Sequence, residues 1–158
     1  MWSLRGHQPK VYTYGGRLRQ HLIGAVDPDR GNLHVAFSNT LKSEQFRQFL
    51  YGLLSRYPKA NKLIVVLDNA KSHHSKQLKN FLESHKDRLE LVFLPKYSPD
   101  LNPMEWFWKY LRKSVTHNTF FDDFNDFRRA IAKFILKHKS SSPEIKSRCS
   151  YAKLFNAL

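Results

Sequence analysis

Short continuous apolar runs alternate along this chain with segments in which apolar residues recur every three or four positions. The continuous runs predict β-strands, at residues 20–26, 32–37, 62–67 and 89–94. The first two are joined by Asp27-Pro28-Asp29-Arg30-Gly31, which is typical of a tight turn and predicts a hairpin. The run at 62–67 is apolar at nearly every position, which indicates a central strand covered on both faces.

The segments with helical spacing lie between and after these strands. Residues 42–57 place Phe46, Phe49 and Leu53 on one face, and Asn39 or Thr40 is the candidate cap. Further helices are predicted from Ser72 or Ser75 to about 86, over about 104–115 and over about 122–138, while 150–157 fits a last short helix. The order β-β-α-β-α-β-α-α predicts a mixed, three-layer α/β domain.

Length and composition fit one globular domain. The chain has 158 residues, of which 41% are hydrophobic. Its longest apolar runs are far shorter than the roughly 20 residues of a membrane span, and residues 1–10 lack the apolar core of a signal peptide. We therefore expect neither export nor membrane association. The single cysteine, Cys149, allows no internal disulfide, which fits a reducing compartment.

Charge narrows the choice of partner. The chain carries 27 Lys and Arg against 13 Asp and Glu, a formal net charge of +14. A domain this basic attracts polyanions through counterion release, and nucleic acid is the commonest of these. The basic residues are spread along the whole chain, which favours a broad binding face over a basic tail.

Two acids stand at positions where a metal site can form. Asp68 follows the apolar run that ends at Leu67, and sites in α/β sheets lie at the carboxyl ends of strands. Glu105 stands at the start of a helix, directly after the turn that contains Pro99 and Pro103. Asp68 could equally cap the next helix, and an acid such as Glu105 is favourable in any first helical turn. Together, however, they are a plausible Mg²⁺ pair for phosphodiester chemistry.

Four further residues near the two acids are candidates for contact with nucleic acid. His73 could touch phosphate or assist proton transfer, and Lys96 and Tyr97 could meet the backbone. Asn102 could orient Glu105 or bind phosphate, although an Asx-turn that holds the loop is the preferred interpretation. Asp27 and Asp29 belong to the hairpin turn, at the far end from Asp68, so neither is counted as a third metal ligand.

Two blocks of sequence carry a resemblance to a known family. The first is Leu67-Asp68-Asn69-Ala70 with His73. The second runs from Leu94 to Glu105, contains YSPDLNPME and is followed by Trp108. Together with Trp2-x-x-x-Gly6-x-x-Pro9 and Gly24-Ala25-Val26, they closely resemble the DDE transposases of bacterial insertion sequences in the mariner-like superfamily.

The resemblance implies an RNase H-like fold, a mixed sheet with flanking helices. It also implies Mg²⁺-dependent cleavage and joining of DNA strands, with Mn²⁺ as a possible substitute. Asp68 matches the family's second catalytic acid and Glu105 the third. The first lies on a central strand just upstream of the Trp-x-x-x-Gly segment, which here begins at Trp2. Residues 1–158 are therefore expected to be a partial catalytic domain that lacks its first central strand, and to be marginally stable alone.

Two functions from different classes remain open. The chain is either part of a transposase, active when completed, or a non-catalytic fragment that binds nucleic acid and modulates intact transposase. Both interpretations imply DNA as a partner, pairing with itself or with intact transposase, and no small-molecule substrate. The expected location is the bacterial cytoplasm, in association with the nucleoid.

Overall fold

The computed structural model describes residues 19–60, 62–68, 75–95 and 98–150. Its longer elements are β1 (His21–Asp27), β2 (Asn32–Ser38), α1 (Ser43–Arg56), β3 (Leu63–Leu67), α2 (Lys76–Ser84), β4 (Leu89–Phe93), α3 (Pro103–Leu111), α4 (Phe124–Lys137) and α5 (Pro143–Cys149). A 3-10 turn, Pro99–Leu101, precedes α3, and a π-helical turn, Arg112–Thr116, follows it. No helix in the described ranges is long and apolar enough to cross a membrane.

The predicted hairpin is present, with the predicted turn. β1 and β2 pair antiparallel, from His21 opposite Ser38 to Asp27 opposite Asn32. The turn closes with a 2.8 Å hydrogen bond from the Gly31 N–H to the Asp27 carbonyl. Gly31 has a φ of +69°, in the left-handed region that glycine enters without steric cost.

The other two strands form a separate sheet. β3 and β4 pair parallel, from Leu63 opposite Leu89 to Leu67 opposite Phe93. Parallel neighbours need a crossover connection, and α2 lies within it. In the described residues the four strands therefore make two two-stranded sheets, β1-β2 and β3-β4.

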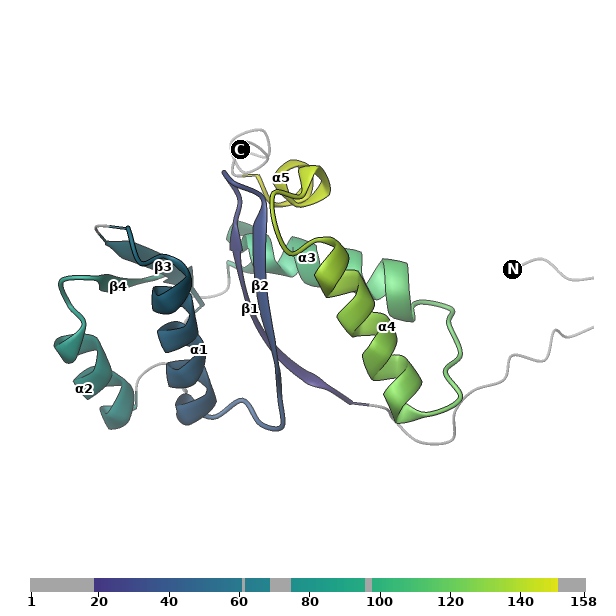
Figure 1. The fold of residues 1–158 in the computed structure, drawn as a ribbon, viewed down its shortest axis with the longest axis horizontal. Helices are drawn as coiled ribbons and strands as arrows, with labels where there is room; N and C mark the ends of the chain where they lie inside the picture. The colour runs from purple at the N-terminus through teal and green to yellow at the C-terminus, as the bar shows by residue number, and fades with distance from the viewer. Residues whose placement is uncertain (1–18, 61, 69–74, 96–97, 151–158) are drawn as a thin grey trace, which may run out of the picture.

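Two hydrophobic cores lie on opposite sides of the hairpin. Figure 1 shows α3 and α4 on one side of β1 and β2, and α1 on the other. The first core joins the hairpin to the C-terminal helices, and its buried residues include Leu33, Phe107, Ile131 and Ile145. The second joins α1, α2, β3 and β4 through residues such as Leu50, Leu78 and Leu89.

Helix starts follow local capping signals in most cases. Ser75, Asn102, Asp123 and Ser142 each accept a backbone N–H at the start of α2, α3, α4 and α5. The prediction for α1 was wrong, because its N-cap is Lys42 and makes no side-chain cap. Thr40 instead donates to Gln45 at 2.9 Å. Helix α5 was not predicted, although Ser142-Pro143 is a usual helix start; the helix expected at 150–157 lies almost wholly outside the described residues.

The hairpin tip is anchored to the loop between α4 and α5. The Ser142 N–H donates to the Gly31 carbonyl at 3.0 Å, and the Leu33 N–H donates to the Lys139 carbonyl at 3.0 Å. The Ser141 N–H donates to the Asn32 side chain, also at 3.0 Å. These bonds fix the hairpin relative to the C-terminal helices at its turn end.

One sequence expectation fails in the described structure. The run at 62–67 was expected to be covered on both faces, yet only Leu63 and Val65 pack against the second core, and Leu67 is the one buried residue of the strand. Ile64 and Val66 are 59% and 41% exposed. The apolar pattern is that of a central strand, but β3 has a neighbour only on its β4 side among the described residues.

Substitution of Gly31 by alanine is expected to destabilise the fold by about 1–3 kcal/mol. An added Cβ would lie 2.6 Å from the Ser142 carbonyl oxygen and would force an unfavourable positive φ on alanine. Urea unfolding, followed by circular dichroism, measures the change. The matched control is Gly52→Ala, at an exposed position of α1 where an added Cβ meets nothing within 4 Å. This substitution is expected to stabilise the fold by about 0.5–1 kcal/mol. Equal changes in the free energy of unfolding for the two substitutions would contradict the anchoring of the hairpin tip to the loop between α4 and α5.

Candidate functional site

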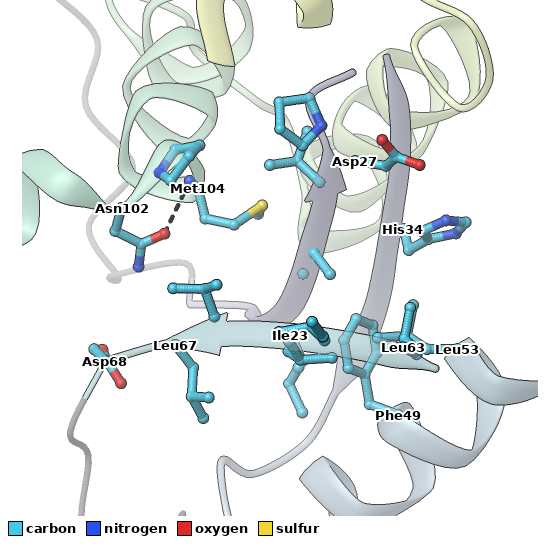
Figure 2. A pocket seen from close by; sticks show the side chains of 18 of the residues that line it. Ile23, Asp27, His34, Phe49, Leu53, Leu63, Leu67, Asp68, Asn102 and Met104 are labelled. Carbon is cyan, nitrogen blue, oxygen red and sulfur yellow. Dashed lines mark hydrogen bonds between the residues drawn. The ribbon is translucent and has the colours of Figure 1, made fainter. Parts of the chain in front are cut away.

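A cavity of about 750 Å³ lies where β1, β3, α1 and the start of α3 approach one another. Asp68, Asn102 and Glu105 all line it. Figure 2 shows Asp68 at the end of β3, with Asn102 toward the same side of the view. The cavity therefore brings together the strand-end acid and the helix-start acid that the sequence singled out.

Asp68 is placed by the parallel sheet. The Leu94 N–H donates to the Leu67 carbonyl at 2.8 Å, so the β3–β4 ladder holds the chain up to the residue before Asp68. The Asp68 side chain is exposed. Asp68 therefore lines the cavity as an exposed residue, directly after a strand that the sheet hydrogen bonds hold in place.

Glu105 is placed by the capped start of α3. The Asn102 side chain accepts the Met104 N–H at 3.0 Å, and the Glu105 N–H donates to the Asn102 carbonyl at 3.0 Å. Pro103 supplies the fixed φ of the first helical position. The preferred interpretation of Asn102, a side chain that holds the loop, is thus what the structure shows. Glu105 itself is half-buried.

A close approach of α3 to β1 sets the position of this helix. Met104 and Phe107 are buried in the first core, on the side of α3 that faces the hairpin. A Cβ added to Gly24 of β1 would lie 2.5 Å from the Met104 Cε and 3.0 Å from the Trp108 ring. Glycine in mid-strand therefore allows α3 to pack directly on β1, and this packing orients Glu105 toward the cavity.

The remaining predicted residues divide into two groups. His73, Lys96 and Tyr97 lie outside the described residues, so their contacts with nucleic acid stay predictions. Asp27 pairs with Arg30 at 3.1 Å, and Figure 2 places it at the opposite end of the cavity from Asp68. The expected separation of Asp27 from Asp68 agrees with this position.

The two acids fit part of a magnesium site. Mg²⁺ takes carboxylate oxygens, and it commonly uses one or two carboxylates with waters and substrate phosphate completing its shell. Asp68 and Glu105 offer two such carboxylates to one cavity. Among the residues that the structure describes, no three His, Cys, Asp or Glu side chains are grouped closely enough to hold a metal ion.

His34 also lines the cavity, and the sequence analysis did not single it out. The Arg56 guanidinium donates to its Nδ1 at 2.6 Å, so Nε2 carries the proton and donates to the Tyr57 hydroxyl at 2.8 Å. Burial, with the nearby charge of Arg56, lowers the pKa of His34 from 6.5 to about 4. Partners 22 and 23 residues away give no local sequence signal, so only the fold reveals this group.

This chain matches one protein family and is similar to two known bacterial proteins. Residues 1–128 match the family described as DDE superfamily endonuclease. The chain is 29% identical over 117 residues to the insertion element IS630 uncharacterized 39 kDa protein of Shigella sonnei, covering 74% of this chain and 34% of that protein. It is 28% identical over 106 residues to the uncharacterized protein y4pE/y4sA of Sinorhizobium fredii, covering 67% and 75% respectively.

Solved structures share the fold. The Mos1 transposase paired-end complex with left transposon end matches at a TM-score of 0.67 and 16% identity, over 99% of this chain and 49% of that one. The Mos1 transposase catalytic domain with raltegravir and Mg matches at 0.58 and 21% identity, over 84% and 74%. The predicted RNase H-like α/β class is confirmed by this likeness. The chain spans about a third of the 39 kDa relative and about half of the Mos1 chain.

The depressed pKa of His34 predicts a stability that depends on pH. Between pH 6.5 and about 4 the unfolded chain binds a proton at this residue that the folded chain does not. The contribution of His34 to the free energy of unfolding is therefore complete above pH 6.5 and is lost as the pH falls toward 4. Urea unfolding of the chain at pH 7 and at pH 4.5, compared with His34→Gln, measures it. The variant is expected to show a weaker fall in unfolding free energy; an identical fall would remove His34 as its source.

Proposed function

Because this chain belongs to the DDE superfamily endonucleases, we propose that it is part of the catalytic domain of a transposase that cuts and joins DNA strands with Mg²⁺. One observation carries the proposal: Asp68, at the end of a parallel strand, and Glu105, in the first turn of α3, open onto the same cavity. The two acids stand 37 positions apart in the chain, and each belongs to a different part of the fold.

Asp68 and Glu105 are the residues that would hold the metal, with Mn²⁺ as a substitute. When bound, divalent ions activate the attacking hydroxyl and stabilise the leaving oxygen of a phosphodiester. The protein supplies rigid placement of its two carboxylates. The β3–β4 ladder fixes Asp68, and the Asn102 cap with the packing of Met104 fixes Glu105. Glu105 is half-buried, so part of this residue is exposed to solvent.

DNA is the proposed substrate and partner. A net charge of +14 supports strong, salt-dependent attraction to phosphate. One of the similar solved structures is a complex of Mos1 transposase with its left transposon end. This likeness supports DNA as the partner here. His73, Lys96 and Tyr97 are the proposed backbone contacts near the acids. Because Asn102 is occupied in capping α3, we propose for it the role of a positioning residue rather than a phosphate ligand.

A second candidate is a fragment that binds DNA without cutting it and modulates intact transposase. The observation that favours it is the incomplete metal site, since the described residues contain no cluster of three metal-binding groups. Pairing with another copy or with an intact transposase would then be its function. Under the first proposal, by contrast, Asp68 and Glu105 hold the metal in the complete catalytic domain.

A chimera distinguishes the two candidates. The segment of the Shigella sonnei 39 kDa protein that matches this chain is replaced by this chain, and cutting at the ends of that insertion element is assayed with Mg²⁺ or with EDTA. Metal-dependent cutting supports the catalytic proposal. DNA binding by the folded chimera that is equal with Mg²⁺ and EDTA, without any cutting, supports the binding fragment.

Within an active chimera, Asp68→Asn and Glu105→Gln are each expected to reduce cutting by at least about 100-fold, because each removes a metal ligand while keeping the side chain's shape. Affinity for DNA, measured by filter binding in EDTA, should change less than about threefold. The matched control is Glu83→Gln, an exposed acid on α2 that pairs only with Lys86 in the described structure and stands outside the cavity. Full cutting activity of Asp68→Asn or of Glu105→Gln would contradict the assignment of that residue to the metal site.

A further inference from the structure

A buried histidine that the candidate site does not use lies at the end of α4. The side chain of His138 is 1% exposed. Its ring packs against the rings of Tyr110 on α3 and Phe134 on α4, with centroids 5.5 Å and 4.7 Å away. Histidine is less often fully buried than apolar residues are. Because three helices meet around this ring, its protonation state affects how they pack.

His138 is joined to the start of α5 by a short chain of polar contacts. Its Nδ1 lies 3.0 Å from the Ser142 hydroxyl, and this oxygen lies 2.9 Å from a carboxylate oxygen of Glu144. The same hydroxyl accepts the Ile145 N–H at 3.3 Å and so caps α5. His138, Ser142 and Glu144 are here called the α5 latch.

The contacts of Ser142 fix which ring nitrogen of His138 carries the proton. A carboxylate can only accept, so the single hydroxyl proton of Ser142 is donated to Glu144. The His138 Nδ1 must then carry a proton and donate it to the Ser142 oxygen, because two acceptors would otherwise face each other. In the neutral ring, Nε2 is therefore the nitrogen without a proton.

Nε2 is the atom that makes the latch sensitive to acid. It is buried, and within the described part of the chain it has no hydrogen-bond partner. Buried polar atoms nearly always have one. Protonation would add both a positive charge and an N–H without an acceptor to the core, and each is costly. Movement of α5 away from the ring would relieve both costs, because water would then solvate the charge and pair with the N–H.

The charged groups around His138 come from α4 and α5, while α3 contributes the Tyr110 ring. Lys137 precedes it on α4, and Arg148 and Glu144 belong to α5; the Glu144 carboxylate lies 3.9 Å from Nδ1. Burial is the largest cause that lowers the pKa of His138 from 6.5. The charge of Glu144 raises this pKa in part, and the charges of Lys137 and Arg148 lower it further.

We propose that the α5 latch is a proton-sensitive switch: α5 stays docked while His138 is neutral and is released when His138 is protonated. The pKa of His138 is 6.5 when the ring is exposed and lower when α5 is docked, so docking is at full strength above pH 6.5 and weakens as the pH falls. One proton changes the docking equilibrium by at most about tenfold per pH unit. The inference needs neither a metal nor DNA.

Release of α5 would loosen the packing on α3, the helix that carries Glu105. Figure 1 shows α5 beside the turn end of β1 and β2. Ile145 of α5 is buried in the first core together with α3 residues. Arg148 of α5 lies over the Tyr110 ring of α3, 4.1 Å from its centroid. The latch therefore acts on the same helix as the candidate site, from a point outside the cavity lining.

A thiol on α5 reports its release. Cys149 is the only cysteine in the chain and is 0% exposed. A thiol reagent therefore reaches it only when α5 leaves α3 or when the whole chain unfolds. Low concentrations of urea separate these two openings, because a local opening exposes little surface and depends only weakly on urea.

The experiment is thiol labelling of the full 158-residue chain with 4,4′-dithiodipyridine between pH 7.5 and pH 5. Each rate is divided by the rate of the chain unfolded in urea at the same pH, which cancels the effect of pH on the thiol itself. We expect this ratio to rise about tenfold as the pH falls across the range. At pH 5 the ratio should change little in up to about 1 M urea.

Two histidine variants form a matched pair. His138→Phe removes the titrating nitrogens, keeps an aromatic ring beside Tyr110 and Phe134, and leaves the Ser142 cap of α5 in place. Its labelling ratio is expected to be independent of pH. His34→Gln removes another histidine with a lowered pKa, one that contacts the end of α1, and should keep the rise of the unchanged chain.

A third variant tests the latch without changing a buried residue. Glu144→Gln, at an exposed position, removes the negative charge that favours protonation of His138 but keeps an oxygen that can accept the Ser142 hydroxyl proton. Protonation then becomes harder, so the rise in labelling is expected at a lower pH than in the unchanged chain. A rise at the same or a higher pH would count against the latch.

Four other results would overturn the proposal. The first is labelling at pH 7.5 as fast as in urea, which would mean that α5 is not docked. The second is a ratio that does not change with pH, and the third is an equal rise in His138→Phe and in the unchanged chain. The fourth is a rise at pH 5 that depends steeply on urea, which would assign the opening to unfolding of the whole chain.

Discussion

The β1–β2 hairpin is packed against helices on both of its faces, and the positions of the other elements depend on this double packing. On one face it supports α3, α4 and α5, and its tip is hydrogen-bonded to the loop before α5. On the other face, α1 connects it to β3 and β4. A hairpin alone is at best marginally stable in water, so the two cores and the docked tip are what hold it in place.

The two acids of the candidate site are each positioned by one side of this arrangement. Glu105 belongs to α3, which lies directly on β1 because Gly24 leaves room for Met104 and Trp108. Asp68 belongs to the end of β3, which reaches the hairpin through the second core. Their separation therefore depends on the distance between β1 and β3.

The sequence by itself determined most of the local structure and the family. Apolar periodicity placed both strands of the hairpin and all but one of the long helices, because such patterns reflect contacts between residues a few positions apart. The Asp27–Gly31 turn and the Asn102-Pro103 helix start are likewise local signals. The block YSPDLNPME gave the resemblance that the family match confirmed. Tertiary structure alone decided the rest. In the described residues, the division into two sheets, the exposure of Ile64 and the low pKa of His34 all arise from residues far apart in the chain. A continuous apolar run shows that a strand is built to be covered, whereas only the fold shows which neighbour is there to cover it.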